Sequence, residues 1–140
     1  MSFIRLNLNP DGYETGDCVI RAITLALKYN WFMVHDELSF LSRKMSDMPS
    51  SNRVWKQYLV NKGYHEEWAQ NMCPNCLTVE DFCKAHPKGR YILSTAEYLK
   101  AKENLIVTGS HVVAVVDGDW YDTWDSGGDV PLSYFYVHDK

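Results

Sequence analysis

Cys18 is the residue whose type and position most favour covalent chemistry. It follows the turn-forming segment 9–17 and begins an apolar run, CVIRAITLALKY, that predicts a buried helix of about three turns. Thr15 and Asp17 are both suitable N-caps, and either choice puts Cys18 in the first turn. The partial positive charge and free N–H groups of a helix N-terminus stabilise a thiolate, the reactive form of cysteine. The position therefore predicts a nucleophile, or else a buried cysteine that only begins a helix.

A histidine and two aspartates come together in a predicted β-hairpin. His111 begins the strand HVVAVV, Asp117-Gly118 is a favoured turn, and WYDTWD returns. A two-residue turn places His111 opposite Trp124 and one diagonal step from Asp122, whereas a three-residue turn places Asp125 directly opposite His111. Either carboxylate would fix the imidazole tautomer while the other ring nitrogen takes a thiol proton. The candidate catalytic residues are therefore Cys18, His111 and Asp122, with Asp125 as the alternative orienting residue.

The charged and amide residues around Cys18 affect this chemistry. The backbone N–H of Cys18 is the first candidate donor to an oxyanion, and Asn9 is a second, less well spaced one. The negative charge of Asp17 opposes thiolate formation unless the first-turn N–H groups compensate it. Arg21 either supports the thiolate or pairs with a carboxylate at the surface.

Three further cysteines offer an alternative site. Cys73, Cys76, Cys83 and His86 have the residue types of a tetrahedral zinc site, in the pattern C-x2-C-x6-C-x2-H. The segment between the two pairs contains a capping box, T-V-E-D at 78–81, which predicts a short helix ending near His86. Cys83 and His86 are then either two zinc ligands on one helix face or ordinary helix residues.

The remaining pattern places helices first and strands later. The spacing predicts helices over 33–45 and after Ser50-Ser51, and strands at FIRLNL, RYILST and SYFYV. Residues 64–77 read as irregular, and 96–104 as helix or loop. This order indicates an α+β fold rather than alternating βαβ units.

Three motifs together resemble the papain-like cysteine peptidase superfamily. They are GDCVIRA at 16–22, HVVAVVDG at 111–118 and YDTWD at 121–125, and they are most similar to small bacterial and bacteriophage members and to the bacteriocin-leader-processing branch. The resemblance implies a single papain-like domain over 1–140, in which an N-terminal central helix packs on a C-terminal antiparallel sheet. It also implies Cys18 as nucleophile, His111 as general base and acid, and Asp122 as orienting residue. A Gln or Asn a few residues before the Cys is usual in that superfamily, and here Gly12 stands six residues before Cys18.

Composition excludes several other classes. The 140 residues carry a net charge of -4 and no Lys/Arg cluster, which argues against nucleic-acid and membrane-surface binding. No apolar run approaches the roughly 20 residues that span a bilayer, and the N-terminus has no signal-peptide pattern. We therefore expect a cytoplasmic protein with free thiols.

The leading hypothesis is a cysteine peptidase or thiol hydrolase that needs no cofactor and acts on a peptide or protein substrate. The residue types fit acyl transfer as well as hydrolysis. One alternative is a catalytically idle papain-like domain that binds a protein partner, and the other is a zinc-binding interaction module through Cys73, Cys76, Cys83 and His86. The sequence leaves the oligomeric state open.

Overall fold

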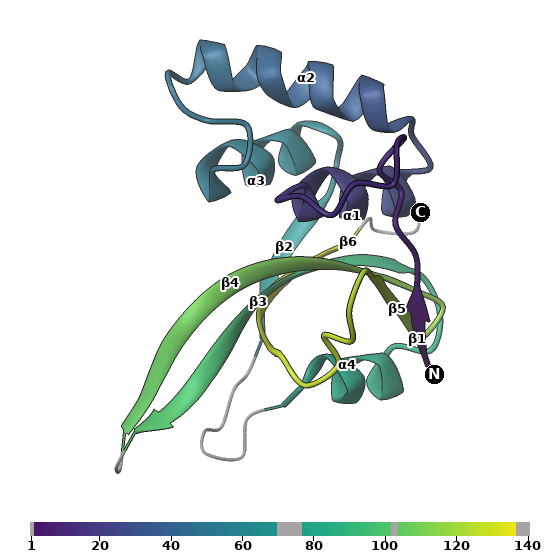
Figure 1. Ribbon diagram of the computed structural model, residues 1–140, viewed down its shortest axis with the longest axis vertical. Coiled ribbons are helices and arrows are strands. Elements are labelled where there is room, and N and C mark those ends of the chain that lie inside the picture. Colours follow the sequence, from purple (N-terminus) through teal and green to yellow (C-terminus); the bar gives the residue numbers. More distant parts are fainter. Residues whose placement is uncertain (1, 70–76, 102–103, 137–140) are drawn as a thin grey trace.

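A computed structural model describes residues 2–69, 77–101 and 104–136 of the chain, with the side chains of 97–110 excepted. It has an α+β fold in which one mixed sheet separates two layers of helices (Figure 1). Helices α1 and α3 pack on one face with α2 stacked outside them, and α4 packs on the other face. The elements are β1 Phe3–Arg5, α1 Cys18–Leu27, α2 Trp31–Lys44, α3 Asn52–Asn61, β2 His65–Trp68, α4 Val79–Ala85, β3 Arg90–Ala101, β4 Asn104–Val116, β5 Asp119–Asp122 and β6 Val130–Tyr136.

The sheet has the order β1-β5-β4-β3-β6-β2 and is antiparallel except for the pair β1 and β5. The N-terminal strand is therefore part of a sheet that the family resemblance implied to be C-terminal and antiparallel. Hydrogen bonds from Ser2 N to Asp119 Oδ1 (2.8 Å) and from Leu6 N to the Asp122 carbonyl (2.9 Å) join β1 to β5 in this parallel arrangement. These contacts join segments more than 100 residues apart, so no local pattern indicates them.

The central strands supply a core on both faces because successive side chains of a strand point to opposite sides. Ile92, Val112 and Ala114 pack with α1, α2 and α3. The neighbouring Leu93, Val113 and Val115 pack instead with α4 and Trp120. The continuous apolar run HVVAVV is thus a strand buried on two faces.

The predicted hairpin has the two-residue turn. Val116 pairs with Asp119, and both Asp117 and Gly118 have positive φ (50° and 82°), as a type I′ turn requires. A Cβ at Gly118 would lie 3.3 Å from Pro87 Cα, so the turn also packs closely against the end of α4. This register excludes the three-residue turn that would have placed Asp125 opposite His111.

Two segments form strands that local patterns did not predict. Residues 65–68, within the segment read as irregular, form the edge strand β2 by pairing with β6. In the segment 96–104, read as helix or loop, residues 96–101 belong to β3 and Asn104 begins β4, and the two strands pair as far as Ala101 and Asn104. In both places the pairing partner, and not the intrinsic propensity of the segment, determines the structure.

The predicted helix boundaries hold better than the predicted caps. Thr78 and Asp81 form the capping box of α4 as expected, and Gly63 with φ of 89° lies just past α3. Ser51 stands at the N-cap of α3, but its hydroxyl donates to Asp47 Oδ2 (3.0 Å) and does not cap the helix.

Candidate active site

Cys18 is the first residue of α1, half-buried where the helix approaches β4. Asp17 is the N-cap residue, but its side chain makes no hydrogen bond to the first turn, so the prediction that Thr15 or Asp17 caps α1 with its side chain is wrong. The N–H groups of this first turn lack intrahelical acceptors, as at any helix start. They are therefore left to stabilise negative charge beside Cys18.

The Asp17 carboxylate is instead the centre of a buried polar network. Its Oδ2 accepts hydrogen bonds from Trp31 Nε1 (3.0 Å) and Asn9 Nδ2 (3.2 Å). Arg21 Nε lies 3.0 Å from Oδ1 at an angle that makes no hydrogen bond, so this contact is an ion pair. The pairing expected for Arg21 is present, although it is nearly buried and not at the surface. Because Asp17 is compensated in this way, its charge opposes a thiolate at Cys18 less than the sequence suggested.

His111 and Asp122 are in direct contact at the open end of the hairpin. His111 Nε2 lies 2.5 Å from Asp122 Oδ2. Three further groups fix the aspartate: Ser126 Oγ donates to Oδ2 (2.8 Å), Thr123 N donates to Oδ1 (2.8 Å), and Leu6 N donates to the Asp122 carbonyl (2.9 Å). The carboxylate is thus held in one orientation toward the imidazole. Ser126 was not among the sequence candidates, since nothing marks a serine in a Gly-rich loop as its partner.

Asp125, the alternative orienting residue, makes different contacts. Its Oδ1 accepts from Trp120 Nε1 and from Gly127 N, both at 2.9 Å. This carboxylate therefore organises the loop after β5, while Asp122 is the one in contact with His111.

Cys18 contacts His111 from the opposite layer of the fold. The imidazole and the thiol share a hydrogen bond, and the backbone N–H of Val112 donates to the sulfur. Because Nε2 of His111 is held by Asp122, Nδ1 is the ring nitrogen left for Cys18. The three candidate residues thus form one chain of contacts, Cys18 to His111 to Asp122.

The electrostatics of this chain favour a charged pair. Burial opposes ionisation of Cys18, but the hydrogen bond and positive charge of His111, helped by Val112 N–H and Arg21, lower the thiol pKa below its ordinary value. Burial likewise opposes a charged His111, yet the hydrogen bonds to Asp122 and Cys18 raise the imidazole pKa to about 9. Both shifts favour a thiolate beside an imidazolium over the neutral thiol and imidazole.

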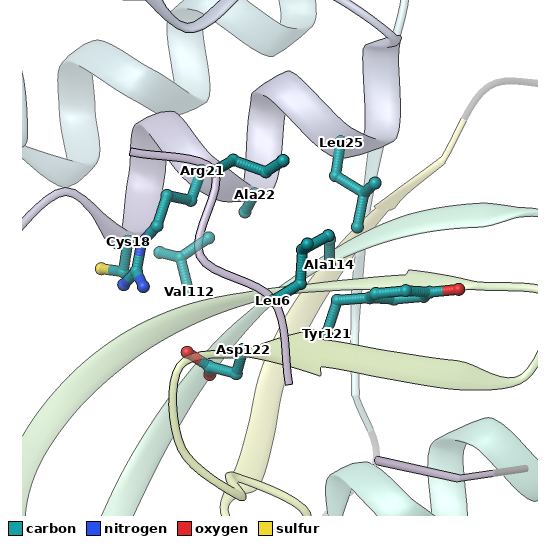
Figure 2. A pocket seen from close by; sticks show the side chains of 10 residues that line it. Leu6, Cys18, Arg21, Ala22, Leu25, Val112, Ala114, Tyr121 and Asp122 are labelled. Atoms are coloured by element: carbon teal, nitrogen blue, oxygen red, sulfur yellow. The ribbon is translucent and has the colours of Figure 1, made fainter. Parts of the chain in front are cut away.

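Two hollows flank Cys18. A cavity of about 10 Å³, close to the space of one water molecule, lies between α1 and the strands, with Cys18 and Arg21 at one end above Asp122 (Figure 2). A larger pocket of about 80 Å³ is lined by both Cys18 and His111. Trp124 covers the imidazole, with ring centroids 4.9 Å apart, and is itself 39% exposed. Of the two hollows, the larger one is thus the one that both Cys18 and His111 line.

Asn9 is not placed to serve as an oxyanion donor. Its Nδ2 is committed to Asp17, and its Oδ1 accepts from Asp11 N and Tyr13 N. Asn9 therefore ties the N-terminal loop to the start of α1. Of the two donors considered from the sequence, the Cys18 backbone N–H remains.

The candidate zinc ligands lie away from this site where they are described. Cys83 is fully buried in the core between α4 and the sheet, and burial raises its pKa to about 12. The His86 ring stacks on Phe82 at 3.9 Å, with Nδ1 2.9 Å from the Phe82 carbonyl. Cys73 and Cys76 lie outside the described residues. Within the residues that are described, no three His, Cys, Asp or Glu side chains are grouped as metal ligands.

Comparisons of the chain with protein-family models, with curated proteins and with solved structures find no match. Among the described residues, every helix is too short or too polar to cross a bilayer.

Proposed function

We propose that this chain is a thiol hydrolase, most simply a cysteine peptidase, with a papain-like arrangement of its reactive groups. The observation that carries the proposal is the continuous contact from Cys18 through His111 to Asp122. It joins a residue of α1 to two residues near the end of a hairpin, about 90 positions later in the sequence. Packing alone does not require a thiol, an imidazole and a nearly buried carboxylate to meet at the edge of a pocket.

Each residue has a defined step in the proposed reaction. The Cys18 thiolate attacks the carbonyl carbon of an amide or ester, and the π electrons of the carbonyl move to its oxygen. The tetrahedral intermediate collapses to a thioester as the leaving amine takes the proton of the His111 imidazolium. Water then attacks the thioester while His111 accepts its proton, and the collapse of this second intermediate releases the acid and restores the thiolate beside the imidazolium. Asp122 keeps the imidazole oriented and stabilises its charged form.

The lining of the pocket beside Cys18 constrains the substrate. The described residues of this lining include no acidic or basic group other than His111 and Cys18 themselves. We therefore expect a small, uncharged group of the substrate to occupy this pocket.

Hydrolysis of an activated ester and of a mixed peptide pool tests the proposal. The wild-type protein is expected to hydrolyse both, and Cys18→Ala is expected to lose this activity. His35→Ala is a suitable control, because His35 is half-exposed on α2 and lies outside the chain of contacts. Equal rates for wild type and Cys18→Ala would refute a hydrolase and favour a papain-like domain that only binds a partner.

A further inference from the structure

The pocket beside Cys18 contains an amide group that the proposed reaction has not yet used. Asn52, the first residue of α3, lines this pocket of about 80 Å³ together with Cys18 and His111. Two serines, Ser50 and Ser94, supply the other polar side chains of its lining. Asn52 lies 34 positions after the cysteine, so no local pattern connects the two residues.

A neighbouring tryptophan fixes the orientation of the Asn52 amide. Trp55 Nε1 donates a hydrogen bond to Asn52 Oδ1 (2.9 Å), and an indole nitrogen can only donate. The oxygen of the amide must therefore face Trp55, and Nδ2 must be the other end. Trp55 is 1% exposed and anchored in the core, so it holds the amide firmly. In the described part of the protein, Nδ2 has no acceptor of its own.

We propose that Asn52 Nδ2 donates a hydrogen bond to the oxyanion of the tetrahedral intermediate, together with the backbone N–H of Cys18. The inference rests on the proposed hydrolase function and adds a catalytic residue to it. When the Cys18 thiolate adds to the carbonyl carbon, the electron pair that moves to the oxygen creates the charge that these donors stabilise. The charge returns to the carbonyl when the leaving group departs, so Asn52 neither gains nor loses a proton.

Asn52 suits this role better than the other polar groups near the thiol. Asn9 Nδ2 already donates its hydrogen bond to Asp17. A serine hydroxyl hydrogen, as at Ser50 and Ser94, can turn about its C–O bond, whereas Trp55 already orients the amide of Asn52. Donors that need no reorganisation contribute most to transition-state stabilisation.

Two reactions of Cys18 separate this role from a structural one. Acylation by p-nitrophenyl acetate passes through an oxyanion, whereas alkylation by iodoacetamide displaces iodide at a saturated carbon and forms none. Removing one oxyanion donor is expected to lower the acylation rate about 10²-fold while alkylation stays within about twofold. The ratio of the two rates is therefore the quantity to measure.

Two variants of Asn52 and one control complete the experiment. Asn52→Ala removes the donor and also the acceptor of Trp55, whereas Asn52→Asp removes the donor and keeps that acceptor. Both variants are expected to lower the ratio of acylation to alkylation, and alkylation corrects for any effect of the new charge on the thiolate. Asn61→Ala, at the other end of α3, removes an asparagine whose side chain accepts a hydrogen bond from Gln57 and does not line the pocket, so this variant should leave the ratio unchanged.

The outcomes distinguish this inference from the proposed function. An unchanged ratio in Asn52→Asp, or a parallel loss of both reactions, overturns the role of Asn52 while acylation of wild-type Cys18 keeps the hydrolase in place. Wild-type protein that is alkylated but never acylated contradicts the hydrolase and the oxyanion donor together.

Discussion

Replacing His111 removes the group that most strongly lowers the pKa of the Cys18 thiol. Burial alone raises that pKa, and the hydrogen bond and charge of His111 are the largest contributions that lower it. In His111→Ala, burial is opposed only by Val112 N–H and by Arg21, so the thiol pKa rises. His111→Gln is the matched variant, because its amide can still donate to Asp122 but carries no positive charge.

The size of the effect follows from the thiolate population. At pH 7 a cysteine with the ordinary pKa of about 8.5 is only about 3% thiolate, so complete ionisation raises the reactive form about 30-fold. A thiolate of lower pKa is intrinsically less nucleophilic, which offsets part of this gain. We therefore expect both His111 variants to slow alkylation of Cys18 at pH 7 by about tenfold.

Iodoacetamide labelling followed by mass spectrometry of each cysteine-containing peptide measures this rate directly. The wild-type rate at Cys18 should exceed that at Cys83, whose thiol is fully buried with a raised pKa. The difference between wild type and His111→Gln should shrink as the pH rises, because the variant thiol also ionises. Equal rates for the two proteins at pH 7, with both folded, would refute the thiolate–imidazolium pair.

Three further predictions concern the neighbours of this pair. Without the Asp122 carboxylate the imidazolium loses its main stabilising partner, so Asp122→Asn should lower the hydrolysis rate about 10²-fold. In a plot of rate against pH, the fall on the alkaline side should also move from near pH 9, where His111 deprotonates, to lower pH. An unmoved fall would contradict this role of Asp122. Arg21→Gln leaves Asp17 nearly buried without its cation, so urea unfolding should show that the free energy of unfolding falls by about 3 kcal/mol. A fall below about 1 kcal/mol would show that the ion pair contributes little. Gly118→Ala introduces a Cβ at positive φ against Pro87 and should destabilise the fold by about 1–2 kcal/mol, measured in the same way; no change would show that the turn readily relaxes.

Local patterns were sufficient for the parts of the fold that depend on nearby residues. The capping box of α4 and the Asp117-Gly118 turn are such parts, because their hydrogen bonds and backbone angles involve neighbours in sequence. The two-residue turn sets the register of the hairpin, and this register brings Asp122, and not Asp125, to His111. Knowing the turn type was therefore enough to choose between the two carboxylates.

Features that depend on distant residues could not be read in this way. The strand β2 exists because β6 pairs with it, and β1 lies parallel to β5 because Ser2 and Leu6 bond to that strand. The side chain of Thr15 or Asp17 was expected to cap α1, but the Asp17 carboxylate contacts Trp31 Nε1 and Arg21 instead. Competition between local and long-range partners decides such positions, and only the three-dimensional structure shows its outcome.

The same distinction applies to the site. Cys18, His111 and Asp122 were found from residue type, helix start and hairpin register. Asn52 and Ser126 were not found in this way, because only their contacts connect them to the site. Asn52 bonds Trp55 and lines the pocket beside Cys18, and Ser126 bonds Asp122.

Trapping the acyl-enzyme tests the central proposal most directly. The protein is mixed with p-nitrophenyl acetate, quenched with acid within the first turnover, digested and analysed by mass spectrometry. The proposed function predicts one acetyl group on the peptide containing Cys18, absent in Cys18→Ala and strongly reduced in His111→Ala. Acetylation spread over lysines and the other cysteines, with none at Cys18, would contradict a nucleophile at the start of α1.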